Sequence, residues 1–478
     1  MAVFIPREYQ HLLRAFIFNN ERCNAFAGMG TGKTSTSIES FAELKLFGEV
    51  ERALVLAPKR VALHSWPDEM VKWKESFGHL SMAAAIGTAD QRLAALRSTP
   101  DILTINYDNI EWLIDQYGDN WPFDMVFADE STRLKGLRIS FQRAKRKDGT
   151  YGMQFIRGQG ATRAKKLARV AHKFVRRWVN LTGSPAPNGL IDVWGQQWFV
   201  DGGQRLGNSF DEFSKRWFRL ALNSTREQQI LEPLPYAQEQ IQRKLAETSM
   251  TINARDWFDI KNPIENIVYI DLPPRARKQY KEIQKEFFTW VQEHPVEVFN
   301  AGAKSMKCQQ MASGSVYYDR DGNWAEVHEE KLKALESIVE ETNGESLLIR
   351  YEFKPDKARI LKAFPNFKTL DDKGSLRDFQ EGRLRGLVVH AASAGHGLDL
   401  QQNCRTLVDY TSSHNLDHDE QIIERVGPTR QKQIGSDKEV YRYRIVARDT
   451  IEETVVLPVL HQKASLQNAL RDAMRHTG

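Results

Sequence analysis

The stretch Ala27-Gly28-Met29-Gly30-Thr31-Gly32-Lys33-Thr34 lies near the start of the chain, after an apolar Phe26 and before a segment with helical character at 35–46. A glycine-rich turn that opens a helix presents several backbone N–H groups to an anion. Lys33 adds a cation for the outer phosphates of a nucleotide, and the Thr34 hydroxyl is a ligand that magnesium accepts. The stretch fits the P-loop pattern G-x-x-x-x-G-K-[ST] except at its first position, where the small Ala27 replaces glycine. The sequence therefore predicts an ATP and magnesium site rather than an ordinary glycine turn, formed by Gly28, Gly30, Thr31, Gly32, Lys33 and Thr34.

The length and composition are those of a globular protein with more than one domain. The chain has 478 residues, of which 41% are hydrophobic and 27% charged, and this length exceeds a single hydrophobic core. No apolar run of about 18 residues predicts a membrane span, and the N-terminus lacks the apolar core of a signal peptide. We therefore expect a cytoplasmic protein.

The three cysteines, Cys23, Cys308 and Cys404, lie far apart and form no C-x-x-C pair. This spacing favours neither a zinc site nor a disulfide framework. We interpret each cysteine as a small buried apolar residue.

Short apolar runs follow the P-loop stretch and alternate with helical segments. Each run ends in polar or charged residues. This alternation predicts a parallel sheet covered on both faces, whose ligand lies beyond the carboxyl ends of the strands. The expected strands of the first half are 52–57, 101–105, 125–128 and 178–181.

Asp129 and Glu130 follow one of these expected strands directly. An acid pair at such a position is often only solvated. After a P-loop and an apolar strand, we interpret Asp129 as a magnesium ligand and Glu130 as the residue that polarises the attacking water. Gln10, just before the P-loop, offers the donor and acceptor that an adenine edge requires, although most glutamines are simply solvated.

One segment concentrates the positive charge of the chain. Between Arg133 and Arg177 there are 15 Lys and Arg residues and a single acid, Asp148, while the whole chain has a net charge of only +5. A basic block on an otherwise acidic protein favours a polyanion partner over a solvated loop. Its centre, 145–151, has the composition of a turn, so a hairpin is expected. The aromatic residues that follow, at 194–218, have helical spacing and are interpreted mostly as core.

The second half begins after a domain change expected between 253 and 266. It predicts a second alternating unit without its own P-loop, with strands at 267–272, 346–350, 387–390 and 406–410 and helices at 275–291 and 354–363. The small-residue loop 391–400 would let a backbone approach a nucleotide or a phosphate chain closely. A helix carrying Gln421 and Arg425 would present both on one face, and arginines at such an edge can act as arginine fingers.

In this order, the motifs resemble those of superfamily-two helicases and translocases, and within them the SNF-type group. The P-loop stretch resembles motif I, and Gln10 resembles the glutamine that reads adenine in that family. The match covers nearly the whole chain. The other matching segments are Leu56–Val61 (motif Ia), Thr104–Tyr107 (the next nucleic-acid motif), Asp129–Ser131 (the Asp-Glu box), Leu181–Pro185 (motif III), Leu348–Phe353 (motif IV), Ser393–Asp399 (motif V), Gln421–Gln431 (motif VI) and Asp449–Thr454 (the closing segment).

The resemblance implies an α/β fold with two RecA-like domains in tandem, 1–255 and 256–478, and an ATP cleft between them. It implies ATP hydrolysis with Mg²⁺ and coupled movement on DNA, duplex more than single-stranded, by a minimal viral or bacterial motor without a chromatin-reading or nuclease domain. The second domain would supply Gln421 and either Arg425 or Arg430 to catalysis. Its Gly397 and Asp399 would lie near the nucleotide. Residues expected on nucleic acid are Lys59, Arg60, Tyr107, Ser393 and, in the basic block, Lys145, Arg146 and Lys147.

Two departures from the family pattern leave roles open. Ser131-Thr132 replaces the usual last two letters of the Asp-Glu box, so its link to motif III differs. The second motif VI arginine falls five residues after the first rather than three, so either Arg425 or Arg430 reaches the γ-phosphate.

Two alternative functions also remain. The first is a helicase that acts on RNA or on branched DNA. The second is a nucleic-acid binding module that ATP only switches, although such a module would not need Lys33, Asp129, Glu130 and paired arginines together.

Overall fold

The computed structural model describes residues 3–28, 30–145, 151–156, 162–221, 231–253, 256–257, 260–286, 288–291, 294–297, 301–394, 398–436 and 438–473. It describes the backbone alone for 140–145, 151–156, 162–163, 286, 288–291, 294–297, 301–302, 394, 433, 471 and 473. The chain divides into two compact units. Unit 1 comprises Met1–Trp257 and the chain from Ser465 onward, and unit 2 comprises Phe258–Ala464. The boundary predicted after residue 255 lies close to this division, but the prediction assigned the C-terminal segment to the second domain.

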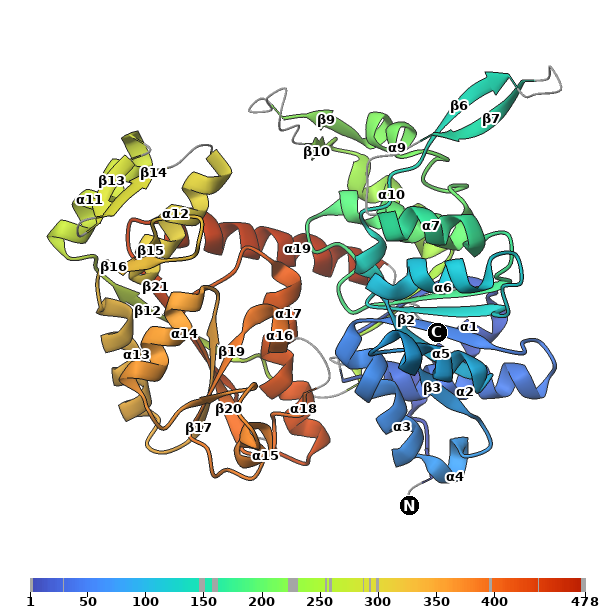
Figure 1. Ribbon diagram of the computed structural model, residues 1–478, viewed down its shortest axis with the longest axis horizontal. Helices are drawn as coiled ribbons and strands as arrows, with labels where there is room; N and C mark the ends of the chain where they lie inside the picture. Colours follow the sequence, from blue (N-terminus) through green and yellow to red (C-terminus); the bar gives the residue numbers. More distant parts are fainter. Residues whose placement is uncertain are drawn as a thin grey trace. The chain divides into compact units, whose positions relative to one another are not determined.

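The core of unit 1 is a parallel sheet in the order β11-β1-β8-β5-β2-β4-β3 (Figure 1). Every residue of β2, β4, β5 and β8 is buried, as expected for strands covered on both faces. The P-loop strand β1 and the Asp-Glu strand β5 are separated by one strand, β8. The strands are β1 (Arg22–Ala27), β2 (Ala53–Ala57), β3 (Met82–Ala84), β4 (Ile102–Asn106), β5 (Met125–Asp129), β8 (Arg177–Leu181) and β11 (Ser249–Ile252).

Helices connect these strands in unit 1. The expectation that the aromatic residues of 194–218 are mostly core is confirmed, since Trp194, Phe199, Phe213 and Trp217 are fully buried. The helices are α1 (Glu8–Asn19), α2 (Lys33–Leu46), α3 (Trp66–Lys72), α4 (Lys74–Phe77), α5 (Ala89–Arg97), α6 (Ile110–Tyr117), α7 (Thr162–Ala171), α8 (Val193–Asp201), α9 (Phe210–Trp217) and α10 (Ala237–Ala246).

The hairpin predicted inside the basic block is confirmed. Strands β6 (Ser140–Lys145) and β7 (Tyr151–Ile156) pair antiparallel, with Lys145 opposite Tyr151. The hairpin extends away from the sheet of unit 1 (Figure 1). A second antiparallel pair in this unit joins β9 (Phe218–Leu220) and β10 (Leu231–Pro233).

Unit 2 contains the second predicted parallel sheet, in the order β12-β21-β20-β17-β19-β18. Its strands are β12 (Ile264–Ile270), β17 (Ser346–Tyr351), β18 (Lys368–Thr369), β19 (Gly386–His390), β20 (Cys404–Asp409) and β21 (Tyr441–Ala447). The predicted α/β class with two RecA-like sheets in tandem is therefore confirmed.

The remaining elements of unit 2 are helices and two short antiparallel pairs. The helix predicted over 275–291 ends earlier, at Glu286, because Phe288–Val291 forms a strand instead. The helices are α11 (Pro274–Glu286), α12 (Ala301–Ser313), α13 (Glu330–Glu341), α14 (Lys354–Ala363), α15 (Ser375–Gln380), α16 (Ala391–Ala394), α17 (Leu416–Val426) and α18 (Pro428–Gln433), and the paired strands are β13 (Phe288–Val291) with β14 (His294–Glu297) and β15 (Ser315–Tyr317) with β16 (Trp324–Glu326). The last helix, α19 (Leu457–Ala473), begins in unit 2, and its residues from Ser465 onward belong to unit 1.

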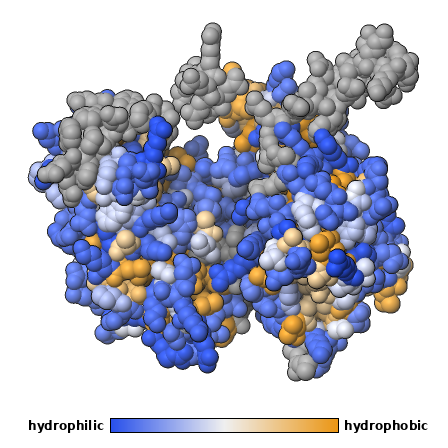
Figure 2. Space-filling model, viewed as in Figure 1, coloured by the Kyte–Doolittle hydropathy of each residue, from blue (hydrophilic) through white to orange (hydrophobic). Residues whose placement is uncertain are grey.

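On the face that Figure 2 shows, the coloured residues are mostly hydrophilic, with hydrophobic residues scattered among them. All three cysteines are buried and free, as the sequence predicted. Within the described ranges, no helix combines the length and apolar character that crossing a membrane requires.

Candidate nucleotide site

Left-handed glycines shape the loop between β1 and α2. Gly30 has a φ of 73° and Gly32 a φ of 75°, a region that residues with a side chain rarely adopt. A Cβ on Gly32 would lie 2.2 Å from Nε2 of Gln10, so the backbone approaches that side chain closely. The Thr31 hydroxyl braces the loop by donating to the Gly28 carbonyl at 2.7 Å. The loop therefore forms a cradle at the N-terminus of α2, which suits a phosphate; Met29 lies outside the described residues.

Lys33 and Thr34 are the first two residues of α2 and are half-buried. The Lys33 ammonium donates to the Ala27 carbonyl at 2.8 Å, so it lies over the loop itself. It is also close enough to Asp129 to lower the pKa of that carboxyl. The cation predicted for the outer phosphates thus lies between the loop and the acid pair.

Gln10 is buried in α1, and its amide joins two parts of the backbone. Its Nε2 donates to the Thr31 carbonyl at 3.1 Å, and its Oε1 accepts from the Arg7 backbone N–H at 2.8 Å. The side chain that the sequence assigned to adenine thus lies directly against the P-loop.

Asp129 is the last residue of β5, and three groups fix it in place. Its Oδ2 accepts from Trp66 Nε1 at 2.9 Å, and its Oδ1 accepts from the Glu130 backbone N–H at 3.1 Å. Its own carbonyl accepts from the Tyr107 hydroxyl at 2.9 Å. Burial and the neighbouring Glu130 raise the pKa of Asp129 to about 6, against the opposing effect of Lys33.

Glu130 adopts a strained backbone conformation. Its φ of 54° and ψ of 54° place it in the left-handed region, which costs a non-glycine residue roughly 1–2 kcal/mol. Such strain is typical of residues whose position a functional site dictates.

The residues present fit a magnesium ion. Asp129 is a buried carboxylate whose negative charge is disfavoured by burial and by Glu130, and a divalent cation would relieve both. A carboxylate with a hydroxyl is a ligand set that Mg²⁺ accepts when phosphate oxygens complete its coordination. Asp129 and Thr34 are the residues that would hold the ion.

Sequence reasoning missed two supporting residues, Trp66 and Gln196, and gave a third, Tyr107, a different role. Trp66 and Tyr107 bind Asp129, as described, and Gln196 binds Ser131. Gln196 Oε1 accepts from the Ser131 hydroxyl at 2.8 Å, while its Nε2 donates to the Pro185 carbonyl at 2.7 Å. One buried amide therefore joins the Asp-Glu box to the motif III segment, which is the link that the sequence left open. A long apolar or amide side chain inside a helix carries no sequence signal of such a role.

The residues predicted to contact nucleic acid occupy different environments. Lys59 is exposed and Arg60 half-buried, in the helical turn that follows β2. Ser393 is exposed on α16. Tyr107, in contrast, is only 3% exposed, so we reassign it from nucleic-acid contact to positioning Asp129. Lys145 ends β6, and Arg146 and Lys147 lie outside the described residues.

Part of the basic block serves the fold of unit 1. Lys135, Lys166 and Lys173 pair with acids, at distances of 3.5 Å to Asp192, 3.2 Å to Glu111 and 2.7 Å to Asp119. Arg177 is buried and donates to main-chain carbonyls of α1. The flanks of the block are thus partly neutralised, so a polyanion partner is better sought at the β6–β7 hairpin.

In unit 2, α17 carries Gln421 and Arg425 one helical turn apart, as predicted, and both are buried. Gln421 Nε2 donates to Asp417 at 3.0 Å. Arg430 lies on the next helix, α18, and forms an ion pair with the exposed Asp399. Gly397 lies outside the described residues. The second arginine is therefore tied to the loop that follows β19.

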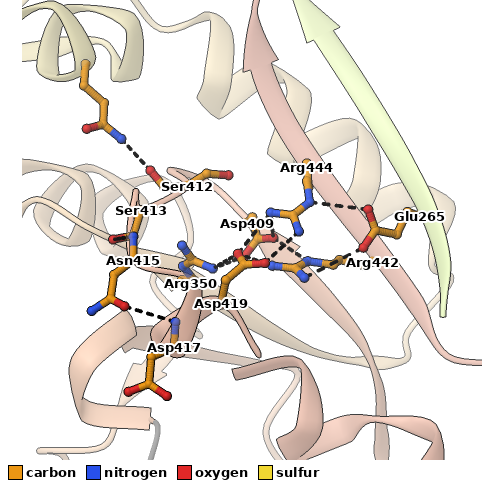
Figure 3. Close-up of polar contacts among 11 residues, drawn as sticks. Glu265, Arg350, Asp409, Ser412, Ser413, Asn415, Asp417, Asp419, Arg442 and Arg444 are labelled. Carbon is orange, nitrogen blue, oxygen red and sulfur yellow. Dashed lines mark hydrogen bonds and ion pairs between the residues drawn. The ribbon is translucent and has the colours of Figure 1, made fainter. Parts of the chain in front are cut away.

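A cluster of buried charges anchors α17 to the sheet of unit 2 (Figure 3). Asp419 of α17 accepts from Arg350 at 2.7 Å, from Arg442 at 2.6 Å and from Arg444 at 2.9 Å. Asp409, at the end of β20, accepts from Arg442 at 2.7 Å. Burial alone would raise the pKa of Asp419, but the three arginines outweigh it and hold that pKa well below its usual value.

The fold and the site define an α/β protein of two parallel-sheet units with a P-loop sequence. No protein-family model matches the chain. A curated relative, "Putative protein p41" of Acyrthosiphon pisum secondary endosymbiont phage 1, is 43% identical over 478 residues, which are 99% of this chain and 100% of that protein. The chain belongs to the same protein family as p41.

Two solved structures are also similar over nearly the whole chain. The Sulfolobus solfataricus SWI2/SNF2 ATPase core in complex with dsDNA is 18% identical, with a TM-score of 0.42, over 99% of this chain and 96% of that one. The SWI2/SNF2 ATPase core domain of the same organism is 17% identical, with a TM-score of 0.40, over 97% of this chain and 90% of that one.

Proposed function

We propose that the chain is a DNA-dependent ATP hydrolase of the SNF-type helicase and translocase group. One observation carries the ATPase proposal: the P-loop after β1 and the acid pair after β5 lie at the same edge of the sheet of unit 1, with only β8 between their strands. Lys33 acts on the carboxyl of Asp129 across that edge. The ordered helicase motifs and the basic block support DNA as the partner.

The mechanism follows from the positions of these residues. The backbone N–H groups of the P-loop and the Lys33 ammonium would bind the β- and γ-phosphates. Mg²⁺, when bound by Asp129 and Thr34, supplies positive charge to the phosphate oxygens. Glu130 would orient a water for in-line attack on the γ-phosphate and accept its proton. Arg425 or Arg430 of unit 2 would stabilise the charge that develops on the transferred group.

The ATPase rate with different nucleic acids tests this proposal. The rate of ATP hydrolysis is measured alone and with single-stranded DNA, plain duplex DNA, forked DNA and RNA at one salt concentration. We expect the strongest stimulation by plain duplex DNA, as for a translocase. Stimulation only by forks, single strands or RNA would favour a strand-separating or RNA helicase. Slow ATP hydrolysis that none of these nucleic acids stimulates would favour the ATP-switched binding module. It would also show that nucleic acid does not stimulate the ATPase.

The centre of the basic block, 145–147, gives a second test. Replacing Lys145, Arg146 and Lys147 with glutamine is expected to weaken duplex binding and to flatten its salt dependence. Each phosphate contact contributes about 0.9 to the slope of log affinity against log salt, so the slope should fall by up to about 2.7. The measurement is a titration of labelled duplex at several salt concentrations.

The matched control removes three charges from the flanks of the same block. Lys166, Lys173 and Arg176 pair with acids of unit 1, so their replacement by glutamine should leave the slope unchanged. An equal slope for the triple variant at 145–147 and the wild type would show that these three residues do not contact phosphates.

A further inference from the structure

Residues 59–72 form one helical segment that touches the candidate nucleotide site. It begins with Lys59 and Arg60 after β2, continues as a π-helical turn at Val61–Ser65 and ends as α3. Lys59 is exposed, whereas Trp66 is fully buried. The segment therefore runs from a basic, solvent-facing turn into the interior of unit 1. A π-helical turn in the middle of such a segment is a feature that recurs at functional sites.

The first contact with the site is made by Trp66. Its indole packs on Phe127 of β5, with ring centroids 5.7 Å apart, and its Nε1 donates to Oδ2 of Asp129 at 2.9 Å. The indole N–H is a donor with a fixed direction. The orientation of the Asp129 carboxylate is thus set by the position of this segment.

The second contact is made by Glu69, one turn later. Its Oε2 accepts from the hydroxyl of Ser35, in the first turn of the P-loop helix, at 2.6 Å. The same oxygen accepts from Trp73 Nε1 at 2.5 Å. Ser35 is only 4% exposed, so this bond is largely shielded from water. One segment thereby holds both the acid strand and the P-loop helix.

The neighbouring strand β4 supports the same arrangement. The Thr104 hydroxyl donates to the Ala62 carbonyl in the π-helical turn at 2.6 Å. Three residues later, the Tyr107 hydroxyl donates to the Asp129 carbonyl. The end of β4 and the residue after it therefore bind both the segment and the backbone of Asp129, whose carboxylate the segment orients.

We propose that the segment 59–72 transmits nucleic-acid binding at Lys59 and Arg60 to the nucleotide site, and that Trp66 is the positioning residue of the magnesium carboxylate Asp129. This inference rests on the proposed function. A phosphate backbone bound at the basic turn would shift the segment and, with it, the indole N–H and the Glu69 carboxylate. The affinity of the site for magnesium and its turnover would then change with nucleic-acid binding.

The experiment compares two tryptophan variants. Trp66→Phe keeps an aromatic ring against Phe127 and removes the N–H. The matched control is Trp194→Phe, since Trp194 is also fully buried and loses a similar bond, from Nε1 to the Gly207 carbonyl at 3.0 Å. The readouts are the Mg²⁺ concentration for half-maximal binding of a fluorescent ATP analogue, without nucleic acid, and the ratio of ATPase rates with and without duplex DNA.

We expect Trp66→Phe to raise the required Mg²⁺ concentration about 10-fold, the usual effect of losing a partner that orients a metal ligand, and to lower the stimulation ratio. Ser35→Ala, which removes the Glu69 contact with little risk to folding, should lower the stimulation ratio too. If Trp66→Phe has the same Mg²⁺ dependence and stimulation ratio as Trp194→Phe, and Ser35→Ala is stimulated as strongly as the wild type, this inference is wrong. The proposed function is not affected by that outcome. Wild-type turnover that no nucleic acid stimulates would overturn the proposed function and this inference together.

Discussion

Replacing Glu130 with glutamine is expected to lower ATP turnover about 100- to 10,000-fold, the range that general bases contribute. Glutamine has nearly the same shape and can keep the strained turn, but it cannot accept the proton of the attacking water. Nucleotide binding should be retained, because the charge of Glu130 raises the pKa of Asp129 and its removal relieves that repulsion. Steady-state turnover and binding of a fluorescent ATP analogue are measured on the same preparation.

Two further variants separate this effect from others. Lys33→Ala should lose nucleotide binding itself, because it removes the cation of the phosphate cradle. Glu239→Gln, an exposed glutamate of α10 paired with Arg243, should behave as the wild type. Normal ATP turnover in Glu130→Gln would show that another group is the base.

The strands around the nucleotide site could be predicted because each is indicated by a pattern of neighbouring residues in the sequence. The runs that became β2, β4, β5 and β8 are mostly apolar, as burial on both faces favours. The P-loop needs only its glycines and Lys33 within a few residues. Neither inference depends on a partner that lies far away along the chain.

Long-range polar contacts could not be predicted in the same way. Trp66 and Asp129 are 63 residues apart, and a tryptophan in an apolar segment has the sequence signal of ordinary core. Tyr107 was assigned to nucleic acid for a related reason, because nothing local shows that its hydroxyl is buried against Asp129. The roles of these side chains depend on which strand ends lie side by side.

Strand β21 is a core strand that could not be predicted from the sequence because it carries charged residues. Its sequence begins Tyr441-Arg442-Tyr443-Arg444, and no strand was predicted there. It nevertheless lies between β12 and β20 inside the sheet. Both arginines are buried because Asp409 and Asp419, on other elements, neutralise them. Only the assembled cluster explains why these charges lie in the interior (Figure 3).

Replacing Asp419 with asparagine is expected to destabilise unit 2 by about 3–5 kcal/mol, the usual cost of removing one partner from a buried ion cluster. Arg350, Arg442 and Arg444 would keep their charges, but only Asp409 and the half-exposed Glu265 would remain to balance them. Since Asp419 also anchors α17, which carries Gln421 and Arg425, ATP turnover should fall as well. Hydrogen exchange of peptides from β21 and α17 measures the effect within unit 2.

The pH dependence separates this electrostatic cause from simple loss of packing. The folded-state pKa of Asp419 is depressed, so its contribution is fully present above its unfolded pKa, near 3.9, and is lost as the pH falls through the folded value. The difference in hydrogen exchange between the wild type and Asp419→Asn should therefore narrow below about pH 4. Asp378→Asn, which breaks a surface pair with Arg383, should cost less than about 1 kcal/mol. An Asp419 variant no less stable than this control would show that the three arginines do not need the carboxylate and that packing alone holds α17 on the sheet.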